Sequence, residues 1–416
     1  MNKDVIKLLI AEYQLKAPHI KFLKRNYVME DTLNYVFVGL RRAGKSYLMY
    51  QQIRHLLDTG HQLDEILYFN FEDERIASLE TEDLELIKIC YEEMYDCQPI
   101  FFLDEIQIVP NWDKFARRLA DQKYRVFITG SNAKMLSSEI ATTLGGRYMI
   151  ENVYPYTFAE YLEVSGFNLS EQNFEYKHQN KIVKAYETYF HFGGLPELTS
   201  VIDKRGWLGS LYQRIFFGDL VTRYQIRNDF ALRVLIRKLS ESVKQASSFN
   251  RLSNLVSSAG KKISTDTVID YLGYLKETWL IFSMENICAK LVDKESNKKY
   301  YFLDNGLLNL FLIDPNTALL ENQVAIRLRQ RFGEEVYYYF HQIEVDFYVP
   351  EERLAIQVCY NVQDEITRKR EIGALLKLAD FMDVDTMLVI TKDDEMELEE
   401  QGRKIQVVPA WKWLLG

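Results

Sequence analysis

The sequence is poor in cysteine, and its cysteines form no pattern. Its four cysteines include no CxxC pair, and they stand at Cys90, Cys97, Cys288 and Cys359. Structural zinc sites and disulfide-stapled domains both depend on paired or regularly spaced cysteines. We therefore expect neither, and we interpret these residues as buried or unreactive thiols.

The sequence also lacks a long apolar run. No stretch approaches the roughly 20 apolar residues that a helix needs to cross a bilayer. The N-terminus carries charged residues, among them Lys7 and Glu12, in place of the apolar core of a signal peptide. We expect a cytoplasmic protein that does not associate with membranes.

Positive charge is the third shortage. Lysine and arginine number 51 against 60 aspartates and glutamates, which gives a net charge of −9. This balance argues against a protein that coats nucleic acid with a broad basic surface, and it leaves a local basic patch open. The length of 416 residues predicts two or three domains at about 150 residues each.

Strands and helices alternate through the first 160 residues. Short apolar strands are predicted at 35–38, 66–71, 100–103, 125–128 and 148–153. A helix is predicted at 46–57, because its apolar residues recur at helical spacing. This alternation is typical of an α/β fold with a parallel sheet covered on both faces, a three-layer arrangement. We assign residues 1–160 to this domain.

The remainder changes character twice. Residues 161–245 read as a helical lid or linker. Residues 246–310 give two helices separated by Gly260 and followed by two strands, an order that resembles a winged helix. Residues 311–416 read as a separate mixed α/β domain.

A phosphate-binding loop follows the first strand. Residues 39–46 read GLRRAGKS, which fits GxxxxGK[ST] between a strand and a helix. Glycines let backbone N–H groups surround phosphates, and the start of the helix adds its positive dipole end. We expect Lys45 to neutralise the β- and γ-phosphates and Ser46 to bind Mg²⁺. The residues predicted to bind ATP are Gly39, Arg42, Ala43, Gly44, Lys45, Ser46 and Tyr47.

Acidic and polar residues follow two later strands. Asp104 and Glu105 end the apolar run at 100–103. We expect Asp104 to help hold Mg²⁺ and Glu105 to act as the base that polarises the attacking water. Ser131 or Asn132, after the fourth strand, could hold the water or the γ-phosphate. The alternative for those two is a simple turn.

Arg147 follows two consecutive glycines, Gly145 and Gly146. A flexible glycine pair that presents an arginine suits an arginine finger, which reaches the γ-phosphate of a neighbouring subunit. That role would require a homo-oligomer. The alternative is an arginine at the surface or at the rim of the core.

These motifs together resemble the prokaryotic AAA+ ATP-binding protein family. The likeness includes the P-loop, the Asp104-Glu105 pair, the segment GSNAKMLSSEIATTLGGR at 130–147 and YPYTF at 154–158. It continues through GGLPE at 193–197, DNGL at 304–307 and Glu321-Asn322. The resemblance implies an AAA+ core, a helical lid with a winged helix, and a C-terminal domain of unknown function similar to restriction nucleases.

Nuclease-like domains of that kind use a helix acid, an aspartate and a Glu-x-Lys strand to hold Mg²⁺ and orient water. This sequence offers Glu321 and Asp346, but Gln357 and Cys359 stand where Glu-x-Lys is expected. An amide is a poor Mg²⁺ ligand beside a carboxylate, and a thiol cannot replace an ammonium. We therefore predict no nuclease activity, unless a relocated lysine such as Lys369 reaches the site.

The second helix of the winged-helix segment carries acids that would repel phosphates, namely Asp266, Asp270 and Glu277. The lysines that flank it could instead touch a nucleic-acid backbone, and they are Lys261, Lys262, Lys290, Lys294, Lys298 and Lys299. Contact with DNA and contact with a protein both stay open.

The sequence therefore predicts a Mg²⁺-dependent AAA+ ATPase that uses ATP to rearrange its C-terminal modules on a partner, either a nucleic acid or a protein. One alternative is an ATP-gated, metal-dependent nuclease. Another is a non-catalytic, ATP-loaded signalling scaffold. Glu105 argues against the scaffold, because a scaffold needs no catalytic base.

Overall fold

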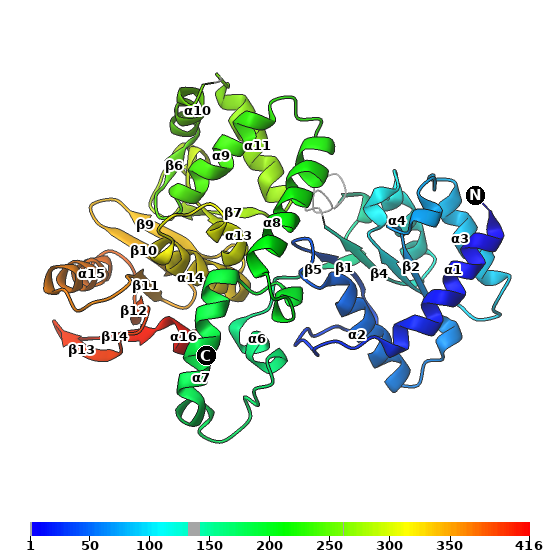
Figure 1. Cartoon of the computed structure of the whole chain (residues 1–416), viewed down its shortest axis with the longest axis horizontal. Helices are drawn as coiled ribbons and strands as arrows, with labels where there is room; N and C mark the ends of the chain where they lie inside the picture. Colours follow the sequence, from blue (N-terminus) through cyan, green and yellow to red (C-terminus); the bar gives the residue numbers. More distant parts are fainter. Residues whose placement is uncertain (1, 132–141, 261) are drawn as a thin grey trace. The chain divides into compact units, whose positions relative to one another are not determined.

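The computed structural model describes residues 2–131, 142–260 and 262–416. The chain divides into two compact units, each with its own sheet (Figure 1). Unit 1 comprises Met1–Tyr154 and Glu277–Trp279, and unit 2 comprises Pro155–Lys276 and Leu280–Gly416. All three C-terminal segments distinguished in the sequence therefore belong to unit 2, apart from the short stretch at 277–279.

The sheet of unit 1 has five strands in the order β2-β3-β4-β1-β5. All of its neighbouring strands are parallel, which confirms the predicted sheet. The strands are β1 (Asn34–Val38), β2 (Ile66–Asn70), β3 (Ile100–Asp104), β4 (Arg125–Gly130) and β5 (Tyr148–Asn152). The longer helices are α1 (Lys3–Lys16), α2 (Lys45–Asp58), α3 (Asp83–Glu92) and α4 (Trp112–Asp121).

Both faces of this sheet are buried, so its strands are almost entirely apolar. On one face, aliphatic and aromatic side chains of α1, α3 and α4 form a single cluster with alternate residues of β1 to β4. The opposite face carries stacked rings, with Phe127 packed between Phe37 and Phe102. Tyr50 of α2 stacks on Tyr68 of β2, so α2 covers this second face.

The sheet of unit 2 has nine strands in the order β13-β14-β12-β11-β10-β9-β7-β8-β6. The first strands in the chain are β6 (Ser247–Ser248), β7 (Ile281–Asn286), β8 (Asn297–Phe302), β9 (Tyr337–Phe340) and β10 (Glu344–Val349). The others are β11 (Leu354–Val358), β12 (Thr386–Thr391), β13 (Met396–Glu400) and β14 (Arg403–Pro409). The sheet is mixed, with parallel pairs at β11–β12, β12–β14 and β7–β9.

Helices surround this second sheet. Those before β7 are α6 (Phe158–Val164), α7 (Phe174–Phe192), α8 (Lys204–Arg214), α9 (Asp229–Glu241), α10 (Phe249–Ser258) and α11 (Thr265–Glu277). Those after it are α12 (Leu291–Ser296), α13 (Asn305–Asn309), α14 (Asn316–Phe332), α15 (Glu365–Leu378) and α16 (Ala410–Trp413). Within the described ranges, no helix is both long and apolar enough to cross a bilayer.

The segment predicted as a winged helix contains α10, α11 and the antiparallel pair β7–β8, in the expected order. However, β7 also pairs with β9, which belongs to the following segment. The domain limit predicted at residue 310 therefore falls inside one continuous sheet. Hydrogen bonding across that limit makes the two segments parts of the same compact unit.

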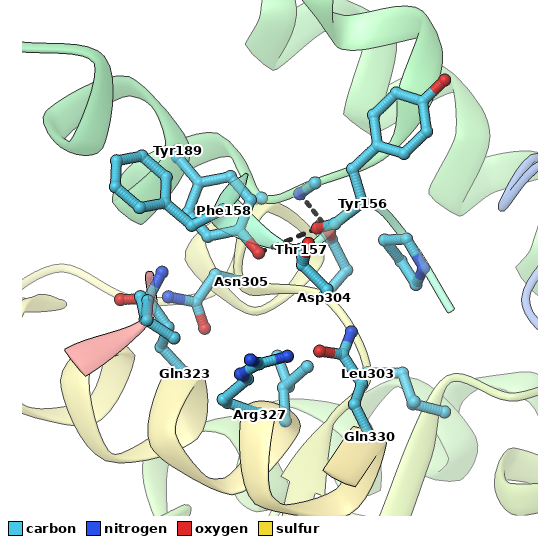
Figure 2. Close-up of a pocket in the computed structure, with 15 residues that line it drawn as sticks. Tyr156, Thr157, Phe158, Tyr189, Leu303, Asp304, Asn305, Gln323, Arg327 and Gln330 are labelled. Carbon is cyan, nitrogen blue, oxygen red and sulfur yellow. Dashed lines mark hydrogen bonds between the residues drawn. The ribbon is translucent and has the colours of Figure 1, made fainter. Parts of the chain in front are cut away.

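The GGLPE motif at 193–197 and the DNGL motif at 304–307 meet inside unit 2 (Figure 2). The buried Asp304 carboxylate accepts hydrogen bonds from the backbone N–H groups of Gly194 and Gly306, both at 2.9 Å. Burial raises the pKa of Asp304 to about 6. Gly193 has φ +78°, and a Cβ there would lie 2.1 Å from the Asp304 carboxylate. These motif residues therefore join α7 to the start of α13, which is a structural role.

Candidate nucleotide-binding site

The P-loop lies between β1 and α2, where backbone geometry explains its glycines. Gly44 adopts φ +101° at the start of α2, a left-handed conformation that favours glycine. A Cβ on Gly39 would lie 2.1 Å from the carbonyl oxygen of Val153, so no larger residue fits there. The loop is therefore held close to the end of β5 and turned into the helix.

Lys45 is buried inside the curve of this loop. Its Nζ donates to the carbonyl oxygens of Gly39 and Leu40, each at 3.2 Å. The same ammonium lies 3.8 Å from Glu105 Oε1. Burial lowers the pKa of Lys45, and the nearby carboxylates oppose that shift. The ammonium is thus positioned at the centre of the loop, where a phosphate group would need a cation.

The other predicted loop residues differ in exposure. Ala43 is buried, and its N–H donates to the carbonyl oxygen of Leu40 at 3.1 Å. Arg42 has φ +65°, an uncommon conformation for a residue with a side chain. Tyr47, in the first turn of α2, is 53% exposed. Its ring is therefore accessible beside the loop.

Asp104 and Ser46 meet at the carboxyl end of the sheet. Ser46 Oγ donates to Asp104 Oδ1 at 3.0 Å, and Asp104 is almost fully buried. Burial raises the pKa of Asp104, and the hydroxyl donors around it oppose that rise. A hydroxyl and a carboxylate so placed offer the oxygen ligands that Mg²⁺ prefers. The predicted Mg²⁺ pair is therefore brought together by β3 and α2.

Two partners of Asp104 were missed from the sequence. Thr129 at the end of β4 donates its hydroxyl to Asp104 Oδ1, and Tyr68 of β2 donates to Oδ2 at 2.5 Å. The strand order β2-β3-β4 places both beside Asp104. Polar residues at or near the ends of neighbouring strands could have indicated these contacts with Asp104, because the carboxyl ends of parallel strands meet at one edge of the sheet.

Glu105 occupies a strained position next to this pair. It has φ +57°, which is rare for a residue with a long side chain and typical of functional positions. Ser131 Oγ donates to Glu105 Oε2 at 3.0 Å, and Gln107 Nε2 donates at 2.5 Å. Burial alone would raise the pKa of Glu105, but Lys45 and these donors lower it. Lys45 and these donors therefore favour the charged form of Glu105 and hold its carboxylate in place.

Of the two residues predicted after β4, Ser131 contacts Glu105, whereas Asn132 lies outside the described residues. Ser131 Oγ donates to the carboxylate of the predicted base, and its contact with water or the γ-phosphate stays a prediction. The structure thus brings Lys45, Ser46, Asp104 and Glu105 into one cluster.

Arg147 lies apart from this cluster. Its Nε donates to Asp121 Oδ1 at 2.6 Å, and it precedes β5, whose first residue Tyr148 is level with Asn34 at the start of β1. The P-loop begins after the other end of β1, five residues further along, which is roughly 17 Å away. An arginine finger at this position would therefore act on a neighbouring subunit and would have to leave Asp121.

Unit 2 contains a second carboxylate cluster, in a cleft of about 720 Å³. Glu321 of α14 and Asp346 of β10 line this cleft, as the nuclease resemblance implies. An ammonium is present, but it comes from Lys299 of β8. Its Nζ lies 3.5 Å from Glu321 Oε1, 3.5 Å from Asp346 Oδ1 and 3.0 Å from Glu344 Oε1.

This arrangement corrects the expectation for two lysines. Lys299 was expected to flank the winged helix as a surface cation, yet it is fully buried, and its neighbour Lys298 is nearly so and pairs with Glu285 at 2.8 Å. Lys369, the example given of a relocated lysine, pairs with Glu365 on α15 at 2.6 Å and also lines this cleft. The error at Lys298 and Lys299 arises because β8 lies inside the sheet, where its lysines need carboxylate partners.

Gln357 and Cys359 have other roles in this cleft. The Gln357 amide accepts from the Asp346 N–H at 2.8 Å and donates to the Glu344 carbonyl at 3.1 Å, so it ties β11 to β10. Burial raises the pKa of the Cys359 thiol to about 12. Across the described part of the chain, no group of three or more histidine, cysteine, aspartate or glutamate residues is arranged to hold a metal ion.

Comparison with known proteins agrees with the geometry of unit 1. A family model described as an AAA domain matches residues 32–162, and a domain of unknown function (DUF8612) matches residues 183–317. The parallel sheet, the P-loop and this match place unit 1 among the P-loop ATPases of the AAA+ class.

The chain is 35% identical over 397 residues to an uncharacterised protein of Methanocaldococcus jannaschii, with 91% of this chain and 88% of that protein aligned. It is 29% identical over 393 residues to an uncharacterised protein of Haemophilus influenzae, with 91% and 94% aligned. The chain therefore belongs to the same family as the Methanocaldococcus protein.

Solved structures give looser likenesses. The Walker-type ATPase PABY2304 of Pyrococcus abyssi aligns with 74% of this chain and 95% of its own, at 14% identity and a TM-score of 0.41. The Orc1 protein of Aeropyrum pernix in complex with DNA aligns with 78% and 93%, at 13% identity and a TM-score of 0.28. Scores below 0.5 indicate only a distant overall likeness.

Proposed function

We propose that this protein is a Mg²⁺-dependent ATPase. The observation that carries the proposal is the convergence of Lys45, Ser46, Asp104 and Glu105 at one edge of a parallel sheet. A cation for phosphate, two oxygen groups suited to Mg²⁺ and an ionised carboxylate are the parts that phosphoryl transfer to water requires.

Each residue has a distinct proposed role. Lys45 and the N–H groups of the loop bind the phosphates of ATP, and Ser46 with Asp104 holds Mg²⁺. When bound, Mg²⁺ neutralises charge on the phosphate oxygens. Glu105 accepts a proton from the attacking water, and Ser131 fixes the carboxylate that does so. Arg147 is proposed to contact the γ-phosphate of a neighbouring copy.

A turnover assay tests this proposal against the non-catalytic scaffold. Steady release of phosphate from ATP in the presence of Mg²⁺ is expected for the full chain. The Glu105 carboxylate, held 3.8 Å from Lys45 beside the loop, favours catalysis because a scaffold needs no base there. ATP that stays bound and unhydrolysed by the wild-type chain would support the scaffold instead.

We further propose that ATP binding and hydrolysis rearrange unit 2 on a macromolecular partner, either a nucleic acid or a protein, in the cytoplasm. The exposed Asp266 and Asp270 on α11 would repel phosphates, which favours a protein contact at that helix. Co-purification with the Glu105→Gln variant is the test. Recovery of nucleic acid, with no protein, would contradict the preference for a protein partner.

The ATP-gated nuclease is the second candidate, and buried Lys299 is the observation that favours it. An ammonium beside Glu321 and Asp346 resembles the lysine of a nuclease site. However, Lys299 is already held by three carboxylates, and the Gln357 amide links two strands. We therefore propose that the cleft does not cleave nucleic acid and that Lys299 supplies the positive charge that a metal would otherwise provide.

A further inference from the structure

The carboxylate of Asp104 receives three hydroxyl groups from three different elements. Ser46 of α2 and Thr129 of β4 donate to Oδ1, and Tyr68 of β2 donates to Oδ2. Asp104 and Tyr68 are only 3% and 1% exposed, so water cannot replace these donors. Tyr68 supplies the hydrogen bond to Oδ2, the oxygen that Ser46 and Thr129 do not reach.

The hydroxyl of Tyr68 is itself held in place by α2. Tyr50 donates to Tyr68 Oη at 2.9 Å, and the two rings stack with their centroids 5.1 Å apart. The edge of the Tyr13 ring packs against Tyr68 at 5.3 Å. Tyr50 follows Ser46 by four residues, so both lie on one face of the helix. Helix α2 therefore contacts one oxygen of Asp104 through Ser46 and controls the other through Tyr50 and Tyr68.

This arrangement fixes the orientation of the Asp104 carboxylate and leaves its charge in place. All three donors are neutral hydroxyls, so they fix the carboxylate without neutralising its negative charge. That charge stays available to a divalent cation beside Ser46. Without the Tyr68 hydroxyl, Asp104 Oδ2 would be buried without a hydrogen-bond donor, and the carboxylate would rotate toward another donor.

We propose that Tyr68 is a positioning residue for the metal half of the nucleotide site, which orients Asp104 toward Mg²⁺ beside Ser46. This inference rests on the proposed Mg²⁺–ATP function, and it adds to it a residue that belongs to no P-loop motif. Tyr68 does not contact ATP in this role. Its effect reaches the nucleotide only through the metal, and the test relies on this difference.

The test measures ATP affinity by calorimetry for wild type and Tyr68→Phe, once with excess Mg²⁺ and once with EDTA. The phenylalanine keeps the ring and its packing and removes the hydroxyl alone. In EDTA the two proteins are expected to bind ATP equally. The affinity that Mg²⁺ adds over EDTA is expected to be about tenfold smaller in Tyr68→Phe, the lower end of the effect of losing one hydrogen bond to a charged group.

Two matched variants distinguish positioning from general damage. Tyr50→Phe keeps the bond from Tyr68 to Asp104, so a smaller loss of the Mg²⁺-dependent gain is expected, about threefold. Lys45→Ala, by contrast, is expected to weaken binding in both media, because its contact is with phosphate.

Three results would overturn the inference. An equal loss of ATP affinity for Tyr68→Phe in both media would mark a purely structural role. No loss in either medium, or a larger loss for Tyr50→Phe than for Tyr68→Phe, would also contradict it. If wild type gained no affinity from Mg²⁺, the proposed function itself would fail, and the role of Tyr68 with it.

Discussion

The nucleotide site of unit 1 and the cleft of unit 2 use the same kinds of residues with opposite results. Each gathers carboxylates around one buried lysine beside a sheet. In unit 1, hydroxyls surround Asp104, and the ammonium of Lys45 stays 3.8 Å from Glu105. In unit 2, the ammonium of Lys299 lies within 3.5 Å of Glu321, Glu344 and Asp346.

The difference lies in what partners each carboxylate. A hydroxyl stabilises a carboxylate and leaves its charge for a divalent cation, whereas an ammonium supplies positive charge itself. In the proposed function Asp104 keeps its charge for Mg²⁺. In unit 2, Glu321 also accepts a hydrogen bond from the Tyr301 hydroxyl at 3.0 Å, but the ammonium of Lys299 offsets part of the negative charge there. Residue type alone does not make a metal site. We infer that the charge of the groups that contact a carboxylate determines whether it can bind a divalent cation.

The largest expected effect is on ATP affinity, and it should differ between Lys45 and Lys299. Lys45→Ala should abolish measurable ATP binding by calorimetry, and turnover with it, because the phosphates lose their central cation. Lys299→Met, the matched removal of the buried lysine of unit 2, should leave ATP affinity unchanged. Wild-type ATP affinity in Lys45→Ala would refute the site.

The next effect concerns the base. Glu105→Gln should bind ATP with Mg²⁺ as the wild type does and hydrolyse it about 10³-fold more slowly, because the attacking water loses its proton acceptor. Phosphate release measured beside a binding isotherm checks both halves. A wild-type turnover rate would remove Glu105 from the mechanism.

A smaller effect is expected for the arginine. Arg147→Ala should lower turnover by about 100-fold and change ATP binding little, since the guanidinium would act on transition-state charge in a neighbouring subunit. Mixing it with Glu105→Gln should restore part of the activity, because a mixed interface can pair an intact base with an intact arginine. If subunit exchange is verified and no ratio restores activity, Arg147 has a structural role with Asp121.

The last prediction is that the chain has no nuclease activity. The purified chain should cleave neither DNA nor RNA with Mg²⁺ or Mn²⁺, with or without ATP, as judged on gels against Asp346→Ala. The reason is the neutralisation of Glu321 and Asp346 by Lys299. Cleavage that needs metal and disappears in Asp346→Ala and in Lys299→Met would promote the nuclease.

The sequence predicted the parts of the site that are local. The P-loop is one continuous segment, and Asp104 and Glu105 directly follow an apolar strand, so their spacing alone indicated their chemistry. The parallel sheet followed from the alternation of elements. Tyr68 and Thr129 were missed because their relation to Asp104 depends on strand order, which local spacing does not encode.

The same limit explains the error at Lys299. Lys299 precedes Glu321 by 22 residues and Asp346 by 47, among lysines that were expected to flank the winged helix. Only the position of β8 within the nine-stranded sheet brings its ammonium to those acids. Arg147 was predicted to act on a neighbouring subunit, and the strand register is compatible with that prediction because it separates Arg147 from the P-loop of its own chain.

The most direct measurement is the number of Mn²⁺ ions bound per chain, followed by electron paramagnetic resonance with and without ATP. One tightly bound ion is expected with ATP, lost in Lys45→Ala and kept in Asp346→Ala, and none is expected without ATP. A tightly bound ion in the absence of ATP that disappears in Asp346→Ala would show that the unit 2 carboxylates hold a metal beside Lys299, and it would contradict the distinction drawn between the two sites.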